Sequence, residues 1–153
     1  IVIQAVLEHV LDPQRCIDEI YRVLSKEGLV YSETPFIQQV HMKEFDFTRF
    51  TYLGHRRLFR QFNLIESGPC CGPGMALGWS FAHFLKSFTN NTVISKIIMK
   101  VSYLFLFPLK YFDYFLINSK GSYDAASAYY FIGSKSDTTL TDNQLISEYK
   151  GFI

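Results

Sequence analysis

The sequence is poor in cysteine and has almost no net charge. Its 153 residues include three cysteines, Cys16 and the adjacent pair Cys70 and Cys71, with no CxxC pair and no metal-ligand spacing. This pattern excludes a disulfide framework and favours a reducing compartment, so we expect a cytoplasmic protein. Fifteen Lys and Arg against 14 Asp and Glu give a net charge of +1, which argues against a nucleic-acid partner. An apolar content of 48% excludes a disordered chain.

Two further sequence features are missing: an N-terminal signal peptide and a glycine-rich nucleotide-binding loop. Residues 1–3 are Ile-Val-Ile, with no charged segment and no cleavage site, so they do not form a signal peptide. They are typical of the end of a buried β-strand, and we expect the sequence to start inside a fold. No GxGxxG run occurs anywhere, which removes the usual fingerprint of a nicotinamide-dependent enzyme.

The first 35 residues have the pattern of a strand, a helix and a second strand. Asp12 is a good helix N-cap and Pro13 suits the first helical position. Apolar residues then recur at helical spacing until Gly28 ends the helix, and residues 29–34 have the composition of a strand. A strand–helix–strand order of this kind builds a parallel sheet, so we expect an α/β domain.

The same stretch resembles a known family. Residues 5–13, Ala-Val-Leu-Glu-His-Val-Leu-Asp-Pro, are followed by Arg22-Val23-Leu24 and by Gly28-Leu29. This order is similar to the fourth strand, helix and fifth strand of class I S-adenosylmethionine-dependent methyltransferases of the type 11 family. The resemblance implies the C-terminal half of a Rossmann-like sheet, strands 4 to 7, with a reversed last strand. The family's glycine-rich cofactor loop has no counterpart, so we expect residues 1–153 alone to bind S-adenosylmethionine poorly and to be inactive.

We divide the chain into four parts on this basis. Residues 1–68 are expected to hold the methyltransferase core from the end of strand 4 to strand 6. Residues 69–127 are expected to be an apolar, aromatic helical insertion, because most of the chain's aromatic excess lies there. Residues 128–135 are expected to be the last strand, and residues 136–153 a polar surface tail.

The resemblance also implies roles for residues at the end of the first strand. Ligands of doubly wound sheets bind beyond the carboxyl ends of the strands. Gln4, Ala5 and Val6 would therefore lie beside the methionine end of the cofactor, with Glu8 and His9 near the reacting centre. A histidine can remove a proton from an acceptor near pH 7, so His9 is the candidate base. The alternative is that Glu8 and His9 only orient the entry to the following helix.

A metal-assisted variant is known among similar methyltransferases, including those that make ubiquinone and those that act on RNA ends. In these enzymes a Glu three residues before the Glu-His pair is a third ligand, and Ala5 occupies that position here. We therefore expect no dedicated metal site, although His41 could supply another donor.

The loop after residue 35 carries a second group of candidates. His41 and Arg49 are candidate substrate contacts, because an arginine can bind an anionic or sugar-bearing acceptor with two hydrogen bonds. The alternative is that Asp46 and Arg49, three residues apart, pair with each other and hold the loop. The basic cluster at residues 55–60 is expected to be a solvated helix face.

The aromatic insertion has two interpretations. Its lysines and Pro108 leave no uncharged stretch long enough for a membrane span, and we expect helices near residues 75–88 and 93–117. The second helix would be either a lid packed on the sheet, which we favour, or an interfacial helix in peripheral contact with a membrane. An apolar cover would suit a hydrophobic or lipid-linked acceptor.

The function expected from these features is methyl transfer from S-adenosylmethionine to a small-molecule, glycan or lipid-linked acceptor. The alternative is a noncatalytic or membrane-associated binding module that keeps only half of the fold.

Overall fold

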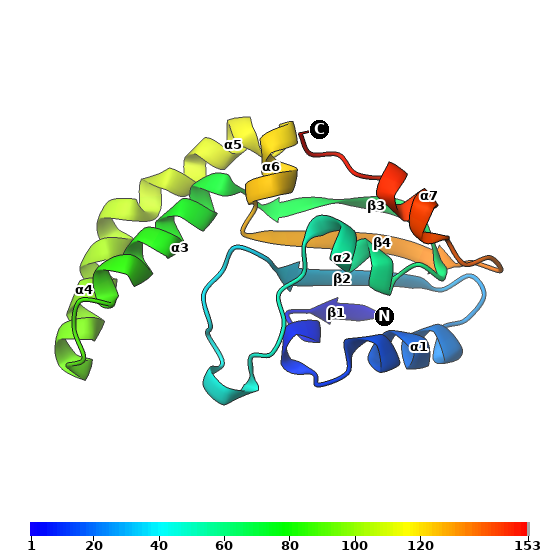
Figure 1. The fold of residues 1–153 in the computed structure, drawn as a ribbon, viewed down its shortest axis with the longest axis horizontal. Helices are drawn as coiled ribbons and strands as arrows, with labels where there is room; N and C mark the ends of the chain where they lie inside the picture. The colour runs from blue at the N-terminus through cyan, green and yellow to red at the C-terminus, as the bar shows by residue number, and fades with distance from the viewer. Residues whose placement is uncertain (153) are drawn as a thin grey trace.

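A computed structural model describes residues 1–152, and it is built on one mixed four-stranded sheet (Figure 1). The strands lie in the order β1-β2-β4-β3, with β1 parallel to β2, and β4 antiparallel to both β2 and β3. This arrangement confirms the predicted α/β half-sheet with a reversed last strand. The strands are β1 (Val2–Gln4), β2 (Leu29–Pro35), β3 (Phe62–Cys71) and β4 (Ala128–Lys135).

Helices α1 (Pro13–Val23) and α2 (Tyr52–Leu58) cover one face of this sheet (Figure 1). The side chain of Asp12 accepts a hydrogen bond from the Arg15 N–H and so caps α1, as its sequence predicts. Thr51 caps α2 in the same way, so this helix begins at Tyr52, whereas the sequence pattern predicts a short helix at about residues 56–62. The main core lies between the helices and the sheet; its fully buried members include Leu7, Ile17, Val30, Phe59, Phe62 and Phe131.

The glycines and prolines of residues 68–74 predict a turn, and this prediction is wrong for residues 68–71. These residues continue β3, which pairs with β4 over its whole length and shifts register twice, between Leu64 and Glu66 and between Pro69 and Cys71. Within residues 1–152, β3 has a strand neighbour on one side only. An edge strand tolerates proline because one of its sides is not hydrogen-bonded to a neighbour.

The C-terminal tail is not a detached surface appendage. Helix α7 (Asp142–Ser147) packs against α2 and buries Leu145, and Arg56 donates a hydrogen bond of 2.7 Å to Glu148. Arg57 and Arg60 both pair with Asp142. Ile153, the last residue of the predicted tail, lies outside the described residues.

The basic cluster of α2 is therefore only partly solvated. His55 is buried among aromatic rings, and its Nε2 lies 2.9 Å from the Ser32 hydroxyl. Burial lowers the pKa of His55 to about 3, because the charged imidazolium would lose its hydration. Its role is structural packing.

The helical insertion predicted for residues 69–127 occupies residues 73–125, because β3 extends to Cys71. Helix α3 (Pro73–Lys86) turns back into α4 (Thr92–Leu106), close to the predicted ranges. A 3-10 segment, η3 (Phe107–Phe112), starts one residue before Pro108 and leads into the short helices α5 (Asp113–Leu116) and α6 (Lys120–Ala125). A proline interrupts regular helical hydrogen bonding, which accounts for the 3-10 geometry.

The hairpin of α3 and α4 projects away from the sheet (Figure 1). The prediction of a lid packed on the sheet is therefore wrong for α4, whose outer apolar side chains are exposed. The continuous helical run Thr92–Leu116 has 25 residues and a mean hydropathy of 1.5 in its most apolar window, of which 6% is buried inside the protein. By length and composition alone, this run is long and apolar enough to cross a membrane. The lysines and Pro108 in its sequence predict the opposite.

Candidate functional site

The residues predicted to carry chemistry meet at the carboxyl end of β1. The chain leaves this strand through Ala5 and forms a single 3-10 turn, η1 (Leu7–His9), before α1 begins. Ala5 has a φ of 51°, in the left-handed region that alanine rarely adopts. This turn buries Glu8 completely, with 0% of the residue exposed.

The Glu8 carboxylate is a buried group without hydrogen-bond partners. Neither of its oxygens accepts a hydrogen bond from any other residue in 1–152. Burying a carboxylate in this way is costly unless a positive charge or a bound ligand compensates it. The nearest candidates are two imidazoles: Nε2 of His9 lies 3.6 Å from Oε1, and Nε2 of His41 lies 3.9 Å from the same atom.

Oxygen atoms of the protein lie near Nδ1 of both histidines and orient their rings. His9 Nδ1 lies 2.8 Å from the Phe45 carbonyl oxygen, which fits an Nδ1–H donor. His41 Nδ1 faces the Gln39 carbonyl at 3.4 Å and an Asp46 carboxylate oxygen at 3.6 Å. In this arrangement the Nε2 atoms turn toward Glu8, and the two rings meet edge to face with centroids 5.1 Å apart. The structure thus brings Glu8, His9 and His41 together.

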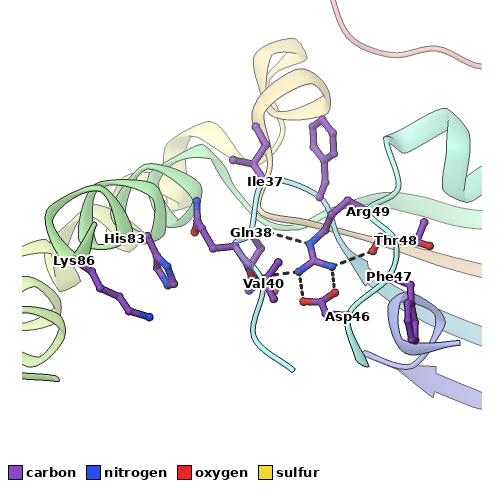
Figure 2. A pocket seen from close by; sticks show the side chains of 11 residues that line it. Ile37, Gln38, Val40, Asp46, Phe47, Thr48, Arg49, His83 and Lys86 are labelled. Atoms are coloured by element: carbon purple, nitrogen blue, oxygen red, sulfur yellow. Dashed lines mark hydrogen bonds and ion pairs between the residues drawn. The ribbon is translucent and has the colours of Figure 1, made fainter. Parts of the chain in front are cut away.

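The 36–49 loop is held in place by Arg49 (Figure 2). Its guanidinium donates to both carboxylate oxygens of Asp46 and to the carbonyls of Gln38, Gln39 and Thr48. These contacts use all of its N–H groups, so the alternative interpretation, pairing within the loop, is the one that the structure shows. Arg49 positions the loop and has no donor left for a substrate.

Asp46 is the centre of this arrangement. Its side chain is buried, and it also accepts a hydrogen bond of 2.9 Å from the His41 backbone N–H. The Arg49 guanidinium, assisted by that N–H, holds the pKa of Asp46 well below its usual range. The pair therefore stays charged and fixes the position of His41.

Backbone hydrogen bonds join the loop to η1. The Glu8 carbonyl accepts from the Phe47 N–H at 2.8 Å and from the Thr48 N–H at 3.2 Å. Two segments about 40 residues apart in sequence are therefore locked together, and the positions of Glu8 and His41 depend on each other.

Gln4, Ala5 and Val6 lie at the end of β1, where the family resemblance places the cofactor. All three residues are exposed, and Gln4 donates a hydrogen bond of 2.6 Å to Glu33 on β2. Their accessibility leaves this edge of the sheet open to a ligand. The sequence prediction that they bind the cofactor stays a prediction.

An open pocket of about 760 Å³ lies between the loop and α3 (Figure 2). Its loop wall comprises residues 36–40 and 46–49, and α3 contributes His83 and Lys86. Sequence reasoning missed these two α3 residues, because nothing in the helical pattern shows that α3 returns to the loop. The hydrogen bond of 3.2 Å from Gln39 to Ser80 fixes this approach. Burial and the nearby Lys86 charge lower the pKa of His83.

Glu8, His9 and His41 could also hold a divalent cation. One ligand atom from each lies within 4.8 Å of the others. Two imidazole nitrogens and a carboxylate oxygen are a donor set that suits Zn²⁺ and similar ions, and hydrogen bonds to Nδ1 are the usual support of metal-bound histidines. The prediction of no dedicated site rested on Ala5, and the structure supplies His41 from a distant loop instead.

Comparison with protein families finds a match to the first part of the chain. Residues 1–32 match the family model described as "Methyltransferase domain". This segment contains β1, η1 and α1, so Glu8 and His9 lie within the matched sequence. The resemblance inferred from the motif at residues 5–13 is confirmed for residues 1–32, which are similar to the methyltransferase domain of the type 11 family.

Two solved structures are similar to the chain at low sequence identity. One is coclaurine N-methyltransferase bound to N-methylheliamine and SAH, with 10% identity and a TM-score of 0.46. The other is the [4+2]-cyclase SpnF, with 12% identity and a TM-score of 0.41. The alignments cover 88% of this chain but only 47% and 48% of those proteins, so the chain spans about half their length. No curated protein matches the chain.

Proposed function

We propose that this chain belongs to an S-adenosylmethionine-dependent methyltransferase that acts on a small-molecule, glycan or lipid-linked acceptor. The observation that carries the proposal is the match of residues 1–32 to the methyltransferase domain family, because that segment places Glu8 and His9 at the carboxyl end of β1. S-adenosylmethionine is the cofactor that the resemblance implies. Its methionine end would lie beside Gln4, Ala5 and Val6.

His9 is the proposed base. In methyl transfer, a lone pair of the acceptor attacks the methyl carbon in line with the carbon–sulfur bond, and the sulfonium leaves as a neutral thioether. An acceptor hydroxyl must lose its proton in this step, and Nε2 of His9 would accept it. The Phe45 carbonyl holds the ring orientation, and the buried Glu8 carboxylate stabilises the resulting imidazolium.

A divalent cation is the alternative use of the same residues, because Nε2 of His9 cannot bind a cation and accept a proton at the same time. Glu8, His9 and His41 would hold it, and a bound cation would act as a Lewis acid that lowers the pKa of an acceptor hydroxyl. The orphaned oxygens of buried Glu8 support this proposal. The network of Asp46 and Arg49 would then keep His41 in position.

The loop pocket is the proposed acceptor site. It shares the 36–49 loop with the Glu8–His9–His41 cluster, and it is lined by polar groups of Gln38, Gln39 and Lys86 beside the apolar Phe36 and Ile37. A mixed lining suits an acceptor with an apolar body and a polar end. This feature supports a glycan-bearing or lipid-linked acceptor over a purely apolar one.

The test is transfer of a labelled methyl group, with the protein as its gene encodes it. Incubation with methyl-labelled S-adenosylmethionine and three separate acceptor pools, soluble metabolites, polysaccharide and total lipid, is expected to label one pool. His9→Ala should reduce labelling by at least about a hundredfold, the usual contribution of a general base. Leu11→Ala, at an exposed site on the same segment, is the matched control. Labelling of no pool would favour the noncatalytic binding module.

A further inference from the structure

The α3–α4 hairpin is packed along a seam of small residues. Gly74, Gly78 and Ala82 recur every fourth residue on α3, and Gly78 faces the backbone carbonyl of Leu106 across the seam. At Gly74 a Cβ atom would collide with the Leu109 carbonyl, so the two segments approach closely. Small residues inside a helix pair and large apolar residues outside it are typical of helices that pack in or on lipid.

One outer face of the hairpin is apolar on both helices. The exposed residues Leu77, Phe81 and Phe84 of α3, and Phe88 just after it, follow spacings of four, three and four. On α4, Ile97 and Val101 are exposed, and they line a groove with Phe88 on the same side of the pair. This continuous surface, which we call the aromatic face, has no cover from any other element within residues 1–152.

The opposite face carries lysines beside aromatic side chains. Trp79 of α3 contacts Tyr103 of α4 there, with ring centroids 5.5 Å apart, and a second groove on this side includes Lys110. Lys100 and Lys96 lie one and two helical turns, respectively, before Tyr103, on the same stripe of α4. Lys110 extends over the Phe107 ring with its Nζ 3.8 Å from the centroid. We call this surface the basic face.

The charged side chains of the hairpin are all positive. No acidic residue occurs between Glu66 and Asp113, whereas four lysines do. Asp113 itself points inward, because its carboxylate accepts hydrogen bonds from the N–H groups of Gly74 and Met75. The hairpin therefore complements an anionic surface.

We propose that the α3–α4 hairpin docks on an anionic lipid bilayer and lies in the plane of its interface. The aromatic face would enter the boundary between headgroups and acyl chains, and the lysines of the basic face would reach the phosphates. A transmembrane orientation would carry Lys96 and Lys100 into hydrocarbon, which is costly. A second copy of the chain fits less well, because its hairpin offers no acidic group to these lysines. This proposal does not depend on methyl transfer.

Vesicle flotation tests the proposal directly. The protein as its gene encodes it is expected to float with phosphatidylcholine vesicles that contain phosphatidylserine, and far less with phosphatidylcholine alone. Replacing both lysines (Lys96→Gln with Lys100→Gln) should weaken partitioning by about fivefold per lysine. Replacing two members of the aromatic face (Phe84→Ser with Phe88→Ser) should weaken it by more than about tenfold.

The controls separate lipid binding from misfolding and from other partners. Leu11→Ser with Ile65→Ser removes two exposed apolar side chains away from the hairpin and should leave flotation unchanged. Equal circular dichroism spectra should show that every variant is folded. Failure to float with either vesicle, or equal flotation of the hairpin variants, would overturn the proposal. Resistance to extraction with alkaline carbonate would indicate a membrane span instead, and dimerisation without flotation would indicate a second copy.

Discussion

At the scale of single residues, the candidate site depends on one buried carboxylate and the two histidines that face it. The motif at residues 5–13 identifies Glu8 and His9 from sequence, because both stand at the end of a strand in a recognisable order. The proximity of His41 could not be derived in this way. It depends on how the 36–49 loop folds back onto η1, which is set by backbone hydrogen bonds to the Glu8 carbonyl.

Cation binding is the first prediction at this scale. Titration of Zn²⁺ or Mn²⁺ into the protein should show one site, and Glu8→Gln or His41→Ala should weaken binding by at least about tenfold because each removes a ligand. Isothermal calorimetry measures this, with His83→Ala as the control histidine outside the cluster. Absence of binding, or equal binding in all variants, would contradict the proposed cation site.

Asp46 gives a second prediction. Asp46→Asn should lower the free energy of unfolding by about 1–3 kcal/mol at pH 7, because it removes a buried, charge-assisted pair with Arg49. The pKa of Asp46 is depressed in the folded state, so its stabilisation is full above the ordinary carboxyl pKa near 3.9 and is lost as the pH falls below that value.

Urea unfolding at pH 7 and near pH 2.5 measures this effect. The difference between wild type and Asp46→Asn should be smaller at the lower pH. Asp137→Asn, at an exposed site, should change neither value. A difference that is independent of pH would contradict the assignment of the charged pair.

At the scale of secondary-structure elements, local sequence signals predict the elements that have caps and clear periodicity. The Asp12–Pro13 start gives α1, and the polar break before residue 93 separates α3 from α4. The pattern fails at β3, where Pro69 and two glycines near it indicate a turn although pairing with β4 extends the strand. It also fails for α7, whose only buried apolar side chain, Leu145, gains its partner from a distant helix.

Asp113 provides a prediction about the hairpin. Its carboxylate accepts from the N–H groups of Gly74 at 2.7 Å and Met75 at 3.1 Å, and so caps the N-terminus of α3 from another element. Asp113→Ala should therefore destabilise the protein by about 1–2 kcal/mol. Hydrogen exchange should quicken in α3 and not in β2, with Asp137→Ala as the control. Unchanged exchange in α3 would show that the cap does not hold the helix.

At the scale of the whole molecule, a half-sheet carries both a candidate chemical site and a projecting hairpin. A half-sheet with a reversed last strand at residues 128–135 was predictable from the family resemblance, and the structure adds that this strand lies between β2 and β3. The direction of the hairpin was not, because its apolar residues are compatible with burial against the sheet or with exposure to lipid. Two structural observations distinguish burial against the sheet from exposure to lipid. They are the position of α3 beside the 36–49 loop and the exposed outer face of α4.

Binding of S-adenosylmethionine tests the central claim most directly. Calorimetric titration of the cofactor into the protein as its gene encodes it should show saturable binding at one site, and S-adenosylhomocysteine should compete for it. Addition of the cofactor should also raise the unfolding temperature, since a ligand that binds only the folded state stabilises it. No saturable binding at millimolar cofactor, with the protein folded by circular dichroism, would contradict the assignment of a methyltransferase.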